Sequence, residues 1–369
     1  MKMKNPLPEA VYLKRTYEKD TPLRGHYFRD QTAIIHSMPF RRLKHKTQVF
    51  LAPANDHVCT RIEHVMHVAS IAKSICLGLN TFGWNLDPDL AFAIGLGHDL
   101  GHAPFGHEGE HFLNLRLGGG NSFIHEINSY RIVEHLANNG KGLNLTYAVK
   151  DGIISHNGES FEQYLVPDNM EKDLETIKNR KVKPSSCEGC IVRFSDKIAY
   201  LGRDIEDAIT AGFIKRDDIP LKVRENIGET NGVIIDKLVN DIILNSKSSD
   251  RIGFSDDIFE YIILLKNFNY EHIYRNSKKE KNLIVVGKII YALFDYLLVL
   301  FEKYNHDYEA YARQELKLEK AFGLYLESLK SFYQSENNPE IIVTDYISGM
   351  TDSYALDCMS QISFPASYF

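Results

Sequence analysis

The chain has 369 residues, of which 44% are hydrophobic and 25% are charged, a composition typical of a globular protein with a large core. Its 43 basic and 49 acidic residues give a formal net charge of −6, which argues against a protein that coats nucleic acid over its whole surface. The N-terminus lacks the apolar stretch of a signal peptide, and the five cysteines are an odd number, thinly spread. We therefore expect a cytoplasmic protein without structural disulfides.

Helical periodicity dominates the chain. Between residues 62 and 79, apolar residues recur at steps of three and four, as in a helix that buries one face. The apolar segment 89–100 follows the same pattern and ends at Gly101 and Pro104, which break helices. Further helices are predicted over 129–137, 195–211, 256–269, 282–304 and 308–331. Strand-like runs are few, with 48–51 as one candidate, so we predict an all-α helical bundle.

No segment reaches the roughly 18 continuous apolar residues of a membrane span. The nearest, 283–301, is interrupted by Lys288 and Asp295. We interpret it as a buried helix and expect no membrane partner.

The connecting segments are polar. The glycine-rich segment 117–121 lacks the Lys-Ser/Thr ending of a phosphate-binding loop and is predicted to be a flexible connector. Segment 157–186 is a charged insertion that we expect to be mobile. Cys187 and Cys190 have no second cysteine pair, so we interpret them as unrelated thiols. Two turns are expected, at 245–250 and 276–281.

A candidate metal site begins with His98 and Asp99, which close an otherwise apolar helix. An imidazole and a carboxylate together suit Mn²⁺, Fe²⁺ or Zn²⁺ and, less well, Mg²⁺. Two adjacent ligands cannot complete a site, but His64 on the preceding helix and Asp196 on a later one could. Alternatively, each polar residue caps or flanks its own helix. Two buried carboxylates without a cation would be costly, which favours the metal site.

These four residues resemble the H…HD…D signature of the HD-domain metal-dependent phosphohydrolases. The sequence HDLGHAPFGH at 98–107 resembles a segment of the dGTPase-like dNTP triphosphohydrolases. Other matching segments are 29–30, 34–37, 40–43, 46–50, 198–200, 204–209 and 345–352. The resemblance spans about residues 15–360 and implies an HD-domain helical bundle with additional C-terminal helices. It divides the chain into an N-terminal segment that contributes to the active site (1–60), an HD core (61–212) and a C-terminal helical region packed on the core (213–369).

The resemblance also implies an activity. Water would attack the α-phosphorus of a dNTP, with dGTP as a candidate preferred substrate, and release a deoxynucleoside and tripolyphosphate. A divalent metal ion, Mn²⁺, Mg²⁺, Fe²⁺ or Zn²⁺, is the implied cofactor. His125 would donate a proton to the leaving oxygen, because the pKa of His lies near neutrality. Glu110 or Glu126 would orient its ring.

Substrate contacts follow from the same resemblance. Arg61, Lys197 and Lys266 are expected to bind the phosphates, and Arg61 lies three residues before His64, on the same helix face. Lys266 is assigned by its spacing to a substrate-facing tyrosine, Tyr274. The remaining expected contacts are to the phosphates (His102, His107) and to the sugar (Gln48, Asp204 and a wall formed by Tyr200).

Two other functions share parts of this pattern. Another HD phosphohydrolase, such as a 5′-nucleotidase or a phosphodiesterase, would use the same metal site but release other products. A non-catalytic nucleotide- or nucleic-acid-binding scaffold would not need the metal site. The resemblance further implies a homo-oligomer, a tetramer or a hexamer, and leaves open the binding of single-stranded DNA or an effector nucleotide.

Overall fold

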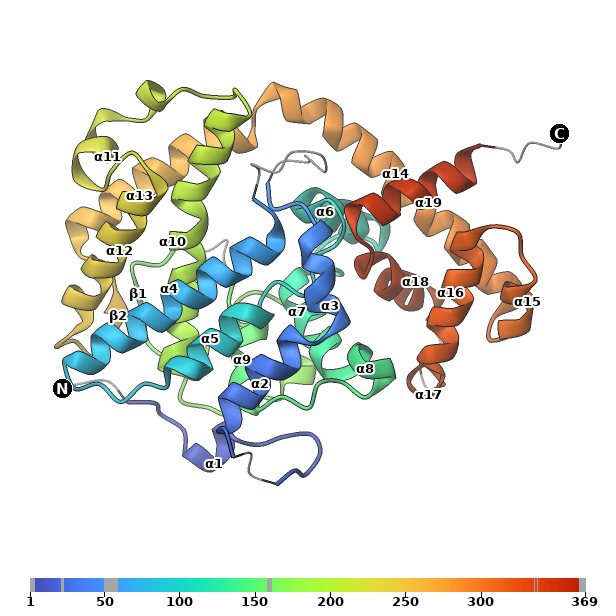
Figure 1. Ribbon diagram of the computed structural model, residues 1–369, viewed down its shortest axis with the longest axis horizontal. Coiled ribbons are helices and arrows are strands. Elements are labelled where there is room, and N and C mark those ends of the chain that lie inside the picture. Colours follow the sequence, from blue (N-terminus) through green and yellow to red (C-terminus); the bar gives the residue numbers. More distant parts are fainter. Residues whose placement is uncertain are drawn as a thin grey trace.

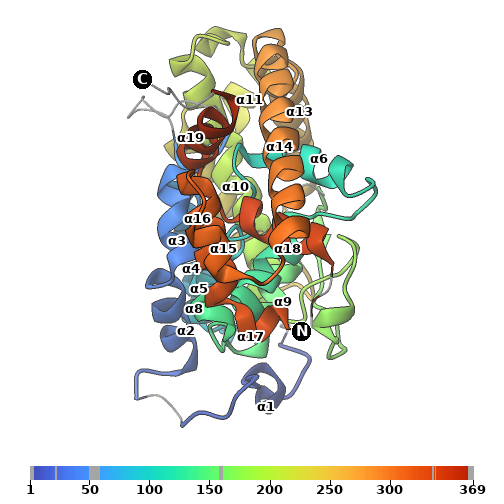
Figure 2. The same ribbon diagram turned by 90° about the vertical axis from the view of Figure 1, so that its right-hand side faces the viewer.

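A computed structural model of the protein describes residues 4–20, 23–49, 59–157, 161–334, 336 and 338–364, with the backbone only for 277–280. Its regular structure is almost entirely helical (Figures 1 and 2), which confirms the predicted all-α class. Within these residues, the one sheet is a short antiparallel pair, β1 (Tyr164–Leu165) and β2 (Ile252–Gly253), in which Tyr164 lies opposite Gly253.

The helices of the first half of the chain are α1 (Glu9–Tyr12), α2 (His26–Ile35), α3 (Met38–Arg42), α4 (Arg61–Thr81), α5 (Pro88–Gly97), α6 (Gly106–Arg116), α7 (His125–Arg131), α8 (Ala137–Gly140), α9 (Tyr147–Ile154) and α10 (Cys187–Thr210). Those of the second half are α11 (Leu221–Asn226), α12 (Asn231–Ser246), α13 (Asp256–Asn269), α14 (Ser277–Tyr304), α15 (Tyr308–Ala312), α16 (Lys317–Ser328), α17 (Lys330–Tyr333), α18 (Pro339–Ser348) and α19 (Asp352–Ser363). Shorter turns are the 3₁₀ helices η1 (Leu43–His45), η3 (Leu174–Thr176) and η4 (Arg216–Asp218), and the π-helical turns η2 (Ile132–Leu136) and η5 (Tyr270–Tyr274).

Helix α4 lies at the centre of the larger core and packs against α5 and α10 (Figure 1). It begins with a capping box, because Thr60 and Glu63 satisfy each other's backbone N–H groups. Helix α5 approaches α4 very closely: a Cβ atom on Gly95 would lie 2.6 Å from Cα of Ala69. This packing brings the first turn of α4, the end of α5 and the middle of α10 to one place.

The C-terminal helices α14–α19 gather on one side of this core and face the viewer in Figure 2. Helix α14 packs against α6, α18 and α19 around a second hydrophobic cluster. Ala103, Phe105 and Leu113, which follow the end of α5 in the sequence, belong to this second cluster. The C-terminal region therefore supports the segment that carries the candidate active-site histidines.

Several predicted boundaries need correction. The turn predicted at 276–281 is wrong beyond its first residue, because α14 already begins at Ser277. The single helix predicted over 308–331 is wrong as well, because α15 folds back onto α16. Tyr311 packs so close to Gly323 that a Cβ atom added to Gly323 would lie 2.3 Å from Cβ of Tyr311. Helix α10 begins at Cys187, eight residues earlier than predicted, because Ser186 caps its first turn.

Some helices were not predicted, and one predicted strand lies partly outside the described residues. Helices α2 and α12 were not anticipated. Of the strand-like residues 48–51, the last two lie outside the described residues, and a single antiparallel bridge joins Thr47 to Thr60.

Among the described residues, two helices are long and apolar enough to cross a membrane, whereas none was expected from the sequence. They are α4 and residues 281–304 of α14, with mean hydropathies of 1.2 and 2.2. Half of the α4 window and 44% of the α14 window are buried inside the protein. Core helices of globular proteins pass the same test, so length and composition alone are weak support for a membrane span.

The first residue of α19 predicts a stability effect. Asp352 is buried and accepts hydrogen bonds from the backbone N–H groups of Thr47 (2.9 Å) and Phe105 (2.8 Å). Asp352→Ala should lower the free energy of unfolding by about 1–3 kcal/mol, because buried donors lose their acceptor. Asp357→Ala, at an exposed position of α19, should change it by less than about 0.5 kcal/mol. Chemical denaturation measures both, and equal stabilities would contradict this role of Asp352.

Candidate metal centre and active site

Four side chains from the α4, α5 and α10 region meet at the predicted metal site, and we call them the ligand quartet. His64 Nε2 lies 3.0 Å from Asp196 Oδ1 and 3.8 Å from Asp99 Oδ2. His98 Nε2 lies 3.4 Å from Asp99 Oδ1 and 3.9 Å from Asp196 Oδ1. All four side chains are buried. Residues far apart in sequence thus present two imidazoles and two carboxylates to one point.

The orientation of His98 tests whether a cation fits between them. Its Nδ1 atom lies 2.8 Å from the carbonyl oxygen of Gly95, and a carbonyl can only accept, so Nδ1 carries the proton. Nε2 is then a bare acceptor, and it is fully buried without a hydrogen-bond partner among the described residues. It faces two carboxylates, which are acceptors as well. A divalent cation satisfies all of these groups, so the quartet fits a metal ion with mixed nitrogen and oxygen ligands.

Arg61 holds one carboxylate of the quartet in place. Its Nη1 donates to Asp99 Oδ2, and its Nε donates to the carbonyl of Thr47 at 3.2 Å. Burial by itself would raise the pKa of Asp99, but the neighbouring imidazoles, His98 first among them, and the Arg61 guanidinium hold that pKa well below its usual range. Asp99 is therefore ionised at neutral pH, as a metal ligand must be.

His125 lies beside the quartet in a separate acid–base cluster. Its Nδ1 is 2.8 Å from Glu110 Oε2 and its Nε2 is 3.2 Å from His156 Nε2. Although burial disfavours a charged ring, the carboxylates of Glu126 and Glu110 raise the pKa of His125 to about 9. The ring therefore carries a proton on each nitrogen at neutral pH. Its face stacks on His102, with 3.8 Å between ring centroids.

His156 was not anticipated from the sequence. Its Nδ1 lies 2.7 Å from the carbonyl of Ile153, so its Nε2 is free to accept from His125. Burial, and next the charge of His98, lowers the pKa of His156 to about 4, which keeps this ring neutral. The signal that could have found it is the same as for His98: a histidine directly after a buried apolar helix.

Arg180 was also not anticipated, because it lies in the charged insertion 157–186. It donates to Glu110 (2.7 Å) and to Glu126 (2.8 Å). The guanidinium thereby links the two carboxylates that surround His125. The structure thus assigns this insertion a part in the acid–base cluster.

A cavity of about 620 Å³ opens next to the quartet, a volume typical of small-molecule sites. Arg61, His102, His107 and His125 line it together with three quartet residues, His64, Asp99 and Asp196. Asp204 and Tyr274 also line it, and Tyr274 donates a hydrogen bond to Asp204. The remaining predicted residues in its lining are Gln48, Tyr200 and Lys266, and the newly found ones are Val49, Phe161, Leu201, Asn267, Asn269 and Tyr270.

The other predicted residues lie behind this lining. His98, Glu110 and Glu126 are buried beneath it. Lys197 is buried too, 3.3 Å from Glu162, and burial lowers its pKa to about 8. Lys266, unlike these four residues, lines the cavity itself. Its ammonium lies 4.5 Å from the centre of the Phe161 ring.

This arrangement defines a class of protein. Residues 61–201 match the HD domain, and residues 252–361 match the phosphohydrolase-associated domain. The quartet lies within the first match, and α14–α19 largely within the second. The protein is an HD-domain phosphohydrolase.

Relatives that align with most of this chain identify its family more closely. The chain is 38% identical to the deoxyguanosinetriphosphate triphosphohydrolase-like protein of Caldanaerobacter subterraneus subsp. tengcongensis over 95% of this chain and 89% of that protein. It is 36% identical to the protein of that name from Clostridium perfringens strain 13, over 97% and 92% of the two chains, and 35% identical to that of Desulfatibacillum aliphaticivorans, over 94% and 90%. The chain belongs to the family of deoxyguanosinetriphosphate triphosphohydrolase-like proteins.

The quartet predicts how the protein responds to loss of a carboxylate. Asp99→Ala and Asp196→Ala each remove a metal ligand, so each should weaken metal binding. Loss of a group that only hydrogen-bonds a ligand costs roughly 10–100-fold in metal affinity, and loss of a ligand should cost more. Asp257→Ala, at an exposed position of α13, should bind metal normally. Elemental analysis of the purified variants measures bound metal directly. Full metal content in both quartet variants would refute the assignment.

Proposed function

We propose that the protein hydrolyses dNTPs, with dGTP as a candidate preferred substrate, to a deoxynucleoside and tripolyphosphate. The observation that supports this proposal is the set of groups that line one cavity. Three residues of the ligand quartet line it together with the proton-bearing His125. Cationic side chains line it as well, and so does a hydrogen-bonded pair of Tyr274 and Asp204. A bound divalent cation would polarise the α-phosphate and activate water.

The chain's own residues divide the remaining work. Arg61, Lys266 and the rings of His102 and His107 are available to the phosphates, whose charge calls for such partners. His125 holds a proton on Nε2, which it donates to His156 in this structure; to act as the acid, His125 would turn this proton from His156 to the leaving 5′-oxygen. Glu110 and Glu126 hold that ring charged, and Arg180 fixes both carboxylates. Gln48 and Asp204 would contact the sugar 3′-hydroxyl, and Tyr200 would form the wall that excludes a 2′-hydroxyl.

The direct test is to identify both products. We expect the purified protein, incubated with each dNTP or NTP and Mn²⁺ or Mg²⁺, to release tripolyphosphate and a deoxynucleoside. Orthophosphate or a nucleoside monophosphate as the product would instead favour another HD phosphohydrolase activity, such as that of a 5′-nucleotidase or phosphodiesterase. The relatives' names refer to deoxyguanosine triphosphate, so dGTP is the first substrate to test.

His125 should act in the transition state alone. His125→Ala should lower kcat by about 10²–10⁴-fold, the usual contribution of general acid catalysis, with KM and metal content nearly unchanged. Arg61→Ala should raise KM as well, because a phosphate contact is lost. The matched control is His111→Ala, an exposed histidine on α6, which should behave like the wild type. Loss of metal from His125→Ala would make this residue a ligand or a structural support instead.

Tyr200 should control the choice of sugar. If its ring forms a wall against the ribose 2′-hydroxyl, dGTP should be preferred to GTP on the order of 10²-fold in kcat/KM. Tyr200→Ala should then reduce this preference, while Tyr200→Phe retains the ring and should keep it. Equal rates for GTP and dGTP in the wild type would contradict this assignment.

A further inference from the structure

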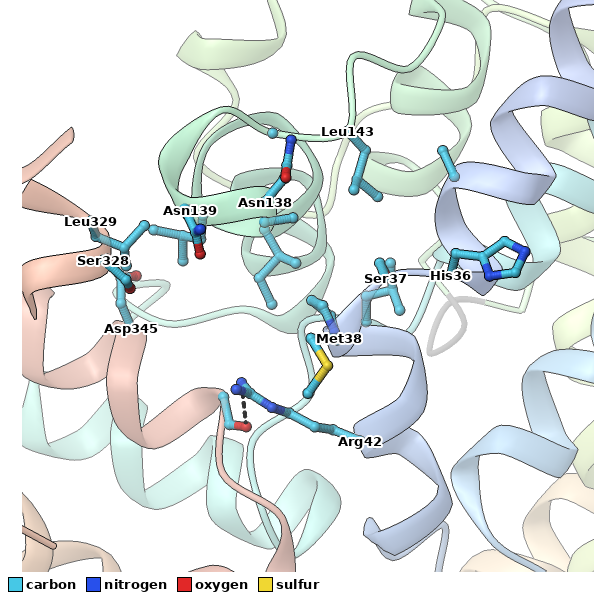
Figure 3. A pocket seen from close by; sticks show the side chains of 18 of the residues that line it. His36, Ser37, Met38, Arg42, Asn138, Asn139, Leu143, Ser328, Leu329 and Asp345 are labelled. Atoms are coloured by element: carbon cyan, nitrogen blue, oxygen red, sulfur yellow. Dashed lines mark hydrogen bonds between the residues drawn. The ribbon is translucent and has the colours of Figure 1, made fainter. Parts of the chain in front are cut away.

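A second cavity, of about 540 Å³, lies between the N-terminal helices and the C-terminal region (Figure 3). Its walls come from α2 and α3, from the turn that follows η2, and from α16 and α18. None of the ligand quartet or His125 lines it. It is therefore separate from the cavity of the proposed reaction, and the inference below does not rest on the proposed function.

Two cationic side chains line this cavity without a paired carboxylate. Arg42 extends across it from α3, and its Nη1 donates to the carbonyl of Gly349 at 3.1 Å (Figure 3). Lys46 lies at its floor and donates to the carbonyls of Ser348 (2.7 Å) and His102. Among the described residues, neither cation lies within ion-pair distance of an acidic side chain. Burial, and next the charge of Arg42, lowers the pKa of Lys46 to about 7.

The one carboxylate in the lining does not balance these charges. Asp345 forms two 2.7 Å hydrogen bonds with Arg131 and accepts a third from Tyr333 at 3.0 Å. Arg29 adds a further cation, and the carboxylate that it contacts, Asp30, is shared with Arg15. The cavity is therefore electropositive and can accept an anion.

Neutral donors lie opposite Arg42. Asn138 and Asn139 are exposed, line the cavity and have positive φ angles of 54° and 56°. A backbone of this kind costs free energy and is often retained where it serves a ligand. The π-helical turn η2, another feature found often at functional sites, immediately precedes them. No hydrogen bond joins either amide side chain to another described residue, so both can bind a ligand.

The rest of the lining is apolar. Met38, Leu100, Leu136, Leu143 and Leu329 contribute to it, and such walls suit a ligand with an apolar body. The cationic floor suits an oxyanion, and an arginine fork with a second cation favours a dianionic phosphate over a carboxylate. We propose that this cavity binds a small organic phosphate, with Arg42 as the principal contact to the phosphate group.

The test uses probes unrelated to the substrate. Phenyl phosphate, inorganic phosphate and benzoate are titrated into the full-length protein by calorimetry, and crystals are soaked in 4-bromophenyl phosphate. We expect phenyl phosphate to bind most tightly, and bromine anomalous signal to place its phosphate at Arg42. Arg42→Gln should weaken binding on the order of 10–100-fold, as for loss of a charge-assisted hydrogen bond. Arg41→Gln, its exposed neighbour on α3, should not.

A second variant serves if Arg42→Gln fails to fold. Ser328 is exposed at the rim of the cavity, and Ser328→Glu adds a repelling charge without touching the core. It should weaken phenyl phosphate binding, whereas Ser331→Glu, exposed on α17 and outside the lining, should not. In the crystal, bromine signal only in the cavity beside the quartet would overturn the proposal. In solution, the proposal would be overturned if benzoate bound as tightly as phenyl phosphate, or if Arg42→Gln or Ser328→Glu left the affinity unaltered. Binding at crystal concentration only would overturn it as well.

Discussion

Two ionised carboxylates, Asp99 and Asp196, lie side by side in the protein interior, and the surrounding structure is organised by the need to compensate them. Arg61 neutralises part of this charge from the first turn of α4, and His64 Nε2, from the same turn, lies 3.0 Å from Asp196 Oδ1. The tautomer of His98 leaves one buried acceptor that faces two carboxylates, a set of groups that a cation satisfies. The capping box of α4, the close approach at Gly95 and the long helix α10 all serve to hold these groups at one point.

The neighbouring histidines show how environment separates chemically identical groups. His125 and His156 lie 3.2 Å apart, yet the pKa of one rises to about 9 and that of the other falls to about 4. The difference arises because Glu126 and Glu110 offset the cost of burial at His125, whereas burial and the neighbouring His98 dominate at His156. One ring is thereby kept as a proton donor and the other as its acceptor. This difference in protonation lies directly beside the candidate metal site.

The C-terminal region is part of this arrangement, since Asp352 holds the backbone of Thr47 and Phe105, which precede the cavity-lining residues Gln48 and His107 in the sequence. Lys46, next to Thr47, donates to the carbonyl of His102 and also lines the second cavity. The two cavities therefore share a structural element. A ligand bound at Arg42 would contact the same framework that positions the active-site histidines.

The all-α class and the helices around 62–79, 256–269 and 282–304 follow from local periodicity, because a helix that buries one face must repeat its apolar residues. The order His64, His98-Asp99, Asp196 likewise predicts a metal site from ligand types alone. Periodicity could not show that residues 308–331 break into three helices, since the fold of α15 onto α16 depends on the contact of Tyr311 with Gly323. Nor could it find Arg180, His156 or the cavity at Arg42. These depend on which side chains from distant segments face each other, and only the tertiary packing decides that.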